Sequence, residues 1–85
     1  MAEKTISPAQ CRAARGLLAW SQVALAEAAG VGLSTVRDLE TERRKVSAEL
    51  VAAICAAIVA AGVELIDSSG WRGVRILNRK TRHRR

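Results

Sequence analysis

The chain has 85 residues, enough for one small domain with a modest core. Two cysteines and a single histidine exclude a plausible zinc site, and no apolar run reaches the ~20 residues of a membrane-spanning helix. The net charge of +6 at pH 7 points to an anionic partner such as nucleic acid. Five positive charges lie in the C-terminal tail, at Arg79, Lys80, Arg82, Arg84 and Arg85, so removing them leaves a net charge of +1.

The first helix is predicted to begin at Ser7, after a flexible lead-in over residues 1–6. Ser7 can accept from a free amide of the first turn, Pro8 stands where its missing N–H costs nothing, and Gln10 can complete a capping box. This helix should run to about Leu18. The side chains expected to face the core are Ala13, Ala14, Leu17 and Leu18, with Arg12 and Arg15 at the rim.

Residues 21–40 are predicted to form two short helices joined by a tight turn. Ser21 can cap the first of these helices, since its hydroxyl can accept from a free backbone amide. Gly30 should end it, because glycine adopts positive φ angles without a Cβ clash. The second helix is expected from Gly32 or Leu33 to Glu40.

This second helix has an unusual outward surface. Val36 and Leu39 are three residues apart and should both face inward. The side chains left on its other faces are Leu33, Ser34, Thr35, Arg37 and Asp38. Hydroxyl and guanidinium groups on an exposed helix suit contacts with base edges and phosphates, so the pattern predicts a recognition helix for nucleic acid.

Residues 41–46 are predicted to form a loop with a basic cluster, which is either solvated or in contact with phosphates. The cluster consists of Arg43, Arg44 and Lys45. Ser47 should then cap a fourth helix with Glu49 in its first turn. A core stripe is expected along that helix at Leu50, Ile54, Ile58 and Ala61, with a second apolar stripe beside it at Val51, Cys55 and Val59. So wide an apolar surface calls for two neighbours, which are the helix's own domain and either a further part of it or a partner chain.

Cys11 and Cys55 both fall in predicted helices among apolar neighbours. We therefore expect two buried free thiols in a reducing cytoplasm. The first ten residues, MAEKTISPAQ, lack the apolar run of a secretory signal, which agrees with a cytoplasmic location.

After Gly62 the apolar period changes from that of a helix to that of a strand. Residues 63–67 and 73–77 are predicted to form two strands around a turn over 68–72. A lone hairpin is marginal in water, so it should either fold back on its own helices or pair with a second copy of the chain. The residues expected in such a homodimer contact are Val63, Leu65, Val74 and Ile76.

The helical part, residues 7–62, resembles the Cro/XRE-type, or lambda-repressor-like, helix-turn-helix of bacterial and phage regulators. The resemblance is carried by Arg15, Ser21, Gln22, Leu25, Ala26, Gly30, Val31, Ser34, Thr35, Val36, Leu39, Glu40, Arg43 and Arg44. It implies a mainly α fold: a four-helix lambda-repressor-like DNA-binding domain over residues 7–62, followed by a β-hairpin over 63–78 and a disordered basic tail over 79–85. The chain departs from the family at Leu33, where a polar or basic side chain is common, and at Glu42, where a glycine is usual.

The resemblance implies a sequence-specific DNA-binding regulator, a homodimeric repressor on an inverted-repeat operator. It implies that Gln22 bridges a phosphate and a base, or braces another base-contacting side chain, and that Arg15 pairs with Glu40 across the first and third helices. The expected DNA-binding residues are Ser21, Gln22, Leu33, Ser34, Thr35, Arg37, Arg43, Arg44 and Lys45.

Two alternatives stay open at this point. A chain of this kind can bind a protein instead of DNA, as an antitoxin or an anti-activator does, and Leu33 and Asp38 leave room for that function. The basic tail is either a solubilising end or an arm that adds phosphate contacts. An enzyme is not expected, because the chain lacks a nucleophile–base set and a glycine-rich phosphate loop, and no cofactor or metal is expected.

Overall fold

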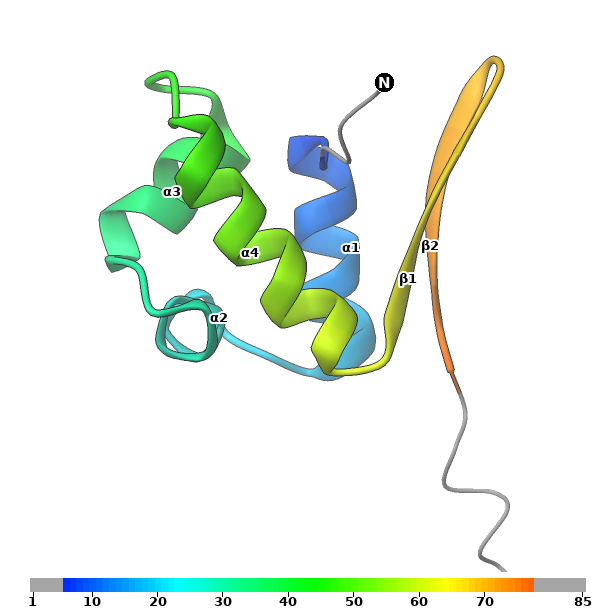
Figure 1. Ribbon diagram of the computed structural model, residues 1–85, viewed down its shortest axis with the longest axis horizontal. Coiled ribbons are helices and arrows are strands. Elements are labelled where there is room, and N and C mark those ends of the chain that lie inside the picture. Colours follow the sequence, from blue (N-terminus) through cyan, green and yellow to red (C-terminus); the bar gives the residue numbers. More distant parts are fainter. Residues whose placement is uncertain (1–5, 78–85) are drawn as a thin grey trace, which may run out of the picture.

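The computed structural model describes residues 6–77, which form four helices followed by a two-stranded antiparallel hairpin (Figure 1). The helices are α1 (Pro8–Leu18), α2 (Gln22–Ala29), α3 (Leu33–Thr41) and α4 (Ala48–Ala60), and the strands are β1 (Val63–Ser68) and β2 (Trp71–Ile76). The predicted mainly α architecture with a C-terminal hairpin is confirmed. The disordered tail predicted for residues 79–85 lies outside the described residues.

The start of α1 has the predicted capping box. Ser7 Oγ accepts from the Gln10 amide and Gln10 Oε1 accepts from the Ser7 amide, both at 3.0 Å. Ile6, predicted to lie in the flexible lead-in, is buried in the core instead. Ile6 directly precedes the cap, and Cys11 lies at the fourth helical position, so the two occupy the positions of a hydrophobic staple. The folded domain therefore begins at Ile6.

Every helix and β1 contribute to one core. Its buried apolar side chains are Ile6, Cys11, Ala14, Leu25, Ala26, Val36, Ile54, Cys55, Ile58 and Val63. Both cysteines are buried and neither forms a disulfide, as predicted. The caps predicted at Ser21 and Gly30 are also confirmed: Ser21 Oγ accepts from the Ala24 amide, and Gly30 has a φ angle of 72°.

Several residues predicted to face the core are exposed. On α4 this is Leu50, and on α1 they are Ala13 and Leu17; Val59, from the second apolar stripe of α4, is exposed as well. The reason on α4 is that α2, α3 and β1 pack against only part of its wide apolar surface, and Figure 1 shows the helix lying across the front of the domain. Among the helices within residues 6–77, none combines the length and apolar character needed to cross a membrane.

The hairpin turn is tighter than predicted. Val63 pairs with Ile76 and Ser68 pairs with Trp71, which leaves only two residues, 69 and 70, between the strands. Gly70 has a φ angle of 91°, a left-handed conformation that glycine adopts without strain and that lets the chain reverse within two residues. Trp71 therefore belongs to β2 and not to the turn.

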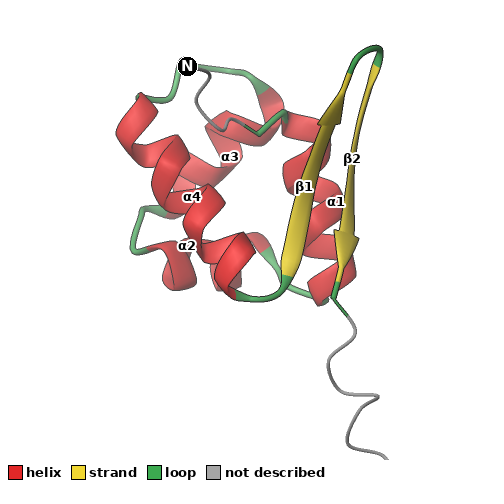
Figure 2. Cartoon of the chain, turned by 45° about the vertical axis from the view of Figure 1, so that its right-hand side comes forward, coloured by secondary structure: helices red, strands yellow, loops and turns green. Residues whose placement is uncertain are grey.

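The hairpin folds back on its own helices, with β1 beside α4 and β2 beside α1 (Figure 2). Val63 is only 1% exposed, and Leu65 and Val74 pack against the core. The prediction that Val63 contacts a partner chain must be corrected, because its side chain is part of the core of its own chain. Gln10 of α1 connects to both strands of the hairpin: its Nε2 donates to the carbonyl oxygens of Ile66 at 3.1 Å and Gly73 at 2.9 Å.

Candidate nucleic-acid interface

The recognition helix predicted over 33–40 is α3, and its inward face is as expected. Val36 is fully buried and Leu39 packs against the core. Ser34 and Arg37 lie on the opposite, exposed side. Their side chains form no hydrogen bond or ion pair with any residue between 6 and 77, so both are available to an external partner.

One exposed residue of this helix was not predicted. Thr41 extends α3 by one residue and lies at the spacing that places it with Ser34 and Arg37, at i, i+3 and i+7. Its hydroxyl donates to the carbonyl oxygen of Arg37 at 2.7 Å. The spacing was visible in the sequence, but the helix was expected to stop at Glu40. We call Ser34, Arg37 and Thr41 the α3 stripe; the half-buried Leu33, Thr35 and Asp38 border it.

The orientation of the α3 stripe is fixed by a buried carboxylate. The Glu40 side chain is 2% exposed and accepts a bidentate bond from Arg15, with Nε to Oε2 at 2.8 Å and Nη2 to Oε1 at 2.9 Å. Gln22 Nε2 donates to Oε1 at 3.0 Å, and Cys11 Sγ donates to Oε2 at 3.1 Å. Each carboxylate oxygen thus accepts two hydrogen bonds. This arrangement, called the Glu40 network below, connects α1, α2 and α3.

Two hydrogen bonds to backbone carbonyl oxygens add to the contacts between these helices. Arg12 Nη1 donates to the carbonyl oxygen of Glu40 at 2.7 Å, near the end of α3. Arg15 Nη1 donates to the carbonyl oxygen of Trp20 at 3.1 Å, in the link between α1 and α2. Within residues 6–77, no buried side-chain nitrogen or oxygen lacks a hydrogen-bond partner. The α3 helix is therefore held by polar contacts with defined directions as well as by apolar packing.

The structure defines the contact of the Gln22 side chain. The resemblance implied that its amide bridges a phosphate and a base or braces another base-contacting side chain, and in the structure the amide nitrogen donates to Glu40. The Arg15–Glu40 pair is found where the resemblance placed it, but the contributions of Cys11 and Gln22 were missed. A cysteine and a glutamine carry no distinctive sequence signal for a carboxylate partner that lies 29 and 18 residues away.

These contacts shift the pKa values of the groups involved. Burial alone would raise the pKa of Glu40, but the hydrogen bonds from Arg15, Gln22 and Cys11 outweigh burial and hold that pKa below its usual value. Burial, followed by the bond to Glu40, raises the pKa of the Cys11 thiol far above its ordinary value. Glu40 is therefore ionised and Cys11 protonated at neutral pH, which is the combination that the observed hydrogen bonds require.

The pKa of Glu40 predicts how stability depends on pH. A carboxyl with a lowered pKa in the folded state contributes stability that is fully present above its unfolded pKa, about 4.3, and is lost as the pH falls through the folded pKa. We expect the melting temperature to fall steeply below about pH 4. In a Glu40→Gln variant this acid-dependent loss should be smaller, whereas in a variant of the exposed Glu27, Glu27→Gln, it should match the wild type. Parallel pH dependences in all three proteins, measured by thermal melts, would count against this role of Glu40.

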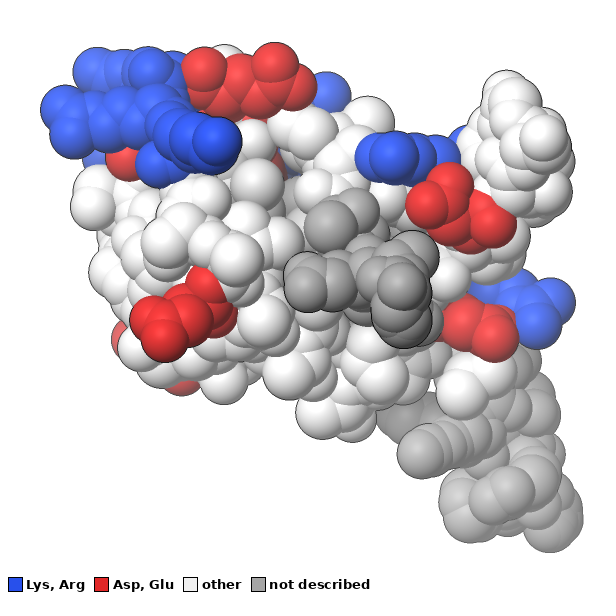
Figure 3. Space-filling view, turned by 45° about the horizontal axis from the view of Figure 1, so that its top comes forward, with Lys and Arg blue, Asp and Glu red and all other residues white. Residues whose placement is uncertain are grey.

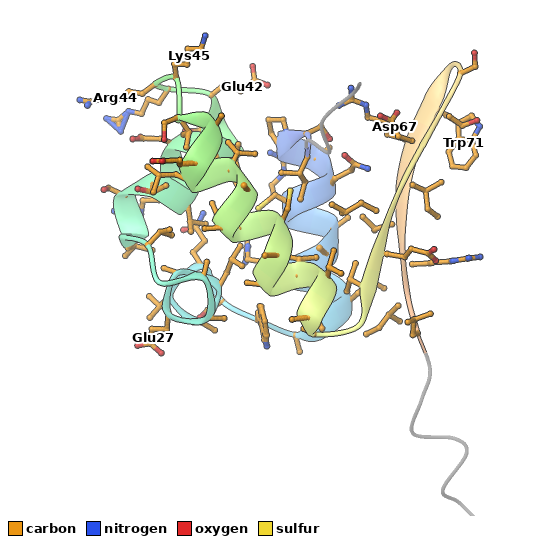
Figure 4. All side chains as sticks on the ribbon, in the orientation of Figure 1. Glu27, Glu42, Arg44, Lys45, Asp67 and Trp71 are labelled. Carbon is orange, nitrogen blue, oxygen red and sulfur yellow. The ribbon has the colours of Figure 1, made fainter. Side chains whose placement is uncertain are left out.

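A basic surface lies at the end of α3. Arg43, Arg44 and Lys45 are all exposed in the loop between α3 and α4. Figure 3 shows basic side chains gathered at this end of the molecule with acidic atoms beside them, and Figure 4 places Arg44 and Lys45 pointing away from the helices, with Glu42 nearby. The predicted basic cluster is thus displayed next to the α3 stripe.

The backbone of this loop keeps the conformation that a glycine would favour. Glu42 ends α3 with a φ angle of 58°, a left-handed conformation that is unfavourable for a residue with a Cβ atom. The departure from the usual glycine therefore changes the side chain at this position and places an acid beside the basic cluster. It does not prevent the left-handed turn.

Comparison with known families settles which kind of helical domain this is. A sequence profile described as helix-turn-helix matches residues 12–58, a segment that runs from α1 into α4. The chain belongs to the Cro/C1-type helix-turn-helix family. It is accordingly a DNA-binding regulator of transcription, in a family that is regulatory and not typically enzymatic. No curated protein sequence matches the chain.

Within the matched segment, α2 ends at Gly30, which has a φ angle of 72°, and α3 follows after a short turn. The hairpin lies beyond the matched segment. The DNA-binding part and the strands can therefore be considered separately.

Proposed function

We propose that the protein is a homodimeric repressor that recognises an inverted-repeat DNA operator with α3 in the major groove. The observation that carries this proposal is the α3 stripe, whose Ser34 and Arg37 side chains have no partner within residues 6–77 although the Glu40 network holds the helix in place. In a chain of the helix-turn-helix family, these hydroxyl and guanidinium groups are free to bond to base edges and phosphates. Repression follows because a small DNA-bound chain can block access of the polymerase.

In this proposal the contacts divide into those that position the protein and those that specify sequence. Arg43, Arg44 and Lys45 hold phosphates beside the groove, and the Ser21 hydroxyl can donate to a phosphate while it accepts from Ala24. These contacts set the register of the protein on the duplex.

Base recognition then falls to the α3 stripe and its borders. Ser34 and Thr35 can bond to base edges, and Arg37 either forms a fork with guanine or clamps a phosphate. Leu33 offers only an apolar contact, for instance to a thymine methyl group. Gln22 keeps its carbonyl oxygen for a base amine or another side chain, while its nitrogen remains on Glu40.

A footprinting experiment tests the proposal. DNA from upstream of the gene should show two protected segments related by a two-fold axis, with centres one helical turn or about 34 Å apart. A reagent that attacks DNA from the major groove should fail to cleave it at the centre of each protected segment. A single asymmetric segment would contradict the homodimer, and the absence of protection at concentrations well above micromolar would favour the protein-binding alternative.

The basic tail gives a separate prediction, which concerns electrostatics alone. The logarithm of the binding constant falls as the logarithm of the salt concentration rises, so this slope is negative. If residues 79–85 act as an arm, removing them should make the slope less negative by about 0.9 for every phosphate that the tail neutralises, with sequence preference unchanged. A matched variant that keeps the length of the tail but replaces its five basic residues by serine should behave like the truncation. Binding titrations between about 50 and 200 mM salt measure both slopes. An unchanged slope in both variants would show that the tail does not touch DNA.

A further inference from the structure

We propose that two copies of the chain join through the free edges of β2, paired antiparallel about a two-fold axis at Val74. The result is a continuous four-stranded sheet across the dimer. This inference rests on the homodimer of the proposed function and specifies the surface, the strand and the register that form it.

The first argument comes from the backbone of the hairpin. The Leu77 amide donates to the Gly62 carbonyl at 2.7 Å, so in the alternating antiparallel pattern residues 71, 73 and 75 bond across to β1. The amides and carbonyls of Arg72, Val74 and Ile76 then point away from β1. Outside the hairpin ladder, these groups form no backbone hydrogen bond with any residue that the structure describes. A pairing centred on Val74 uses all of these groups, because Val74 bonds to the partner's Val74 and Arg72 bonds to the partner's Ile76.

The position of β2 leaves this edge open. β1 lies toward α4, whereas β2 forms the outer border of the domain, as Figure 2 shows. An unpaired strand edge is a template for a further strand, and a two-fold axis allows the same edge to serve both copies. A partner strand can therefore approach β2 without displacing a helix.

The second argument comes from charge. β2 carries Arg72 and Arg75, which already pair within the hairpin with Asp67 and Glu64, respectively. In the register centred on Val74, Arg72 lies opposite the partner's Ile76 and Arg75 lies opposite the partner's Gly73, so no like charges face each other. A shift that centres the pairing on Arg75 would still pair outward-pointing groups, but it would set Arg75 against the partner's Arg75, which is unfavourable.

The third argument comes from exposed apolar surface. The large apolar side chains that the hairpin exposes are Trp71 at 55%, Ile76 at 40% and Leu77 at 51%, all on β2 or directly after it. Figure 4 shows Trp71 on the side of the hairpin that faces away from the helices. In the proposed register Trp71 lies opposite the partner's Leu77 on that outer side. Both would lose exposed apolar area, which favours association.

On the helix-facing side of the sheet, a hollow can accommodate the partner's Ile76. A hollow of about 160 Å³ lies between α1 and β2, lined by Ala9, Gln10, Ala13, Arg72, Gly73 and Val74. The register sets the partner's Ile76 opposite Arg72, at the border of this hollow, and Ile76 faces the helix side of the sheet, as its paired residue Val63 does. Ala9 and Ala13 are exposed, so an isoleucine can reach both.

Two proline variants test the edge. Arg72 and Asp67 lie opposite each other and share one ion pair, so Arg72→Pro and Asp67→Pro break the same interaction and each remove one outward amide. Only Arg72→Pro removes an amide from β2. Analytical ultracentrifugation should show the wild type and Asp67→Pro as dimers and Arg72→Pro as a monomer. Dimers in both variants, or a dimer only in Arg72→Pro, would overturn the inference.

Cysteine cross-linking tests the register and remains decisive if both proline variants become monomeric. Opposite residues of a hydrogen-bonded pair have Cα atoms about 5.5 Å apart, within the range of a disulfide. Val74→Cys should therefore form a covalent dimer under mild oxidation. Ile76→Cys should not, because the two copies of residue 76 lie about 13 Å apart in this register. Absence of the Val74→Cys cross-link, or equal cross-linking of both variants, would overturn the inference.

The failure of this inference and the failure of the proposed function can be told apart. A wild-type dimer that survives Arg72→Pro and gives no Val74→Cys cross-link refutes the β2 contact but leaves a homodimeric repressor intact. A wild-type chain that binds its DNA site as a single copy refutes the homodimer itself.

Discussion

Replacing Arg15 by methionine should cost about 3 kcal/mol of folding free energy, because it leaves the buried Glu40 carboxylate without its charged partner. Gln22 and Cys11 would still donate to Glu40, but neither carries a positive charge. For a small domain this is a large fraction of the total stability. Urea denaturation followed by circular dichroism measures the loss. Operator binding should weaken in parallel, because α3 would lose its fixed orientation.

Replacing the other member of the pair, Glu40, should cost less folding free energy. Glu40→Ala leaves Arg15 uncompensated, but that side chain is 20% exposed and can turn toward water. The two substitutions should be strongly non-additive in a double-mutant cycle, because each removes the same bidentate bond. Arg75→Met is a matched control that removes an arginine from an exposed ion pair, and it should leave the melting temperature unchanged. Unchanged melting and unchanged binding in both Arg15→Met and Glu40→Ala would refute the positioning role of the pair.

Replacing Arg37 by alanine should lower affinity for the operator by about 10- to 100-fold for each half-site, with little change in stability. Arg37 is exposed and its side chain has no partner within residues 6–77, so its removal disturbs nothing in the fold. Fluorescence anisotropy with labelled operator measures the change. Arg75→Ala, which removes the same charge from the hairpin, should have a much smaller effect.

A lysine at position 37 distinguishes the two contacts that remain possible. Lysine keeps the charge but cannot form the planar fork. If Arg37 clamps a phosphate, Arg37→Lys should recover much of the affinity. If Arg37 binds guanine, the variant should bind weakly and lose its preference at one base pair. Full affinity in Arg37→Ala would mean that this side chain does not contact DNA.

The parts of the fold that could be predicted are those whose signals lie within a few residues of each other. Ser7, Ser21 and Gly30 mark helix ends through local hydrogen bonds and local backbone conformation, and the structure confirms all three. The inward face of α3 follows from the spacing of Val36 and Leu39. The pairing of Arg15 with Glu40 is a contact between distant segments, and the resemblance to a known family was what supplied it.

The parts that were missed depend on how the elements pack. Gln10 was recognised as a capping residue, but its second bond, to the hairpin, requires the position of β2 over α1. Cys11 and Gln22 join the Glu40 network only because three helices meet there. Likewise, the apolar pattern of α4 is wider than the surface that its neighbours cover, so sequence alone placed the exposed Leu50 in the core.

The central claim is that the exposed side of α3 is the surface that meets DNA. The most direct test is amide NMR of the full chain, titrated with operator DNA. We expect the largest shifts at residues 33–41, with further shifts at the start of α2 and in the loop around Arg44. Shifts confined to α4 or the hairpin, with α3 unchanged at saturation, would contradict it.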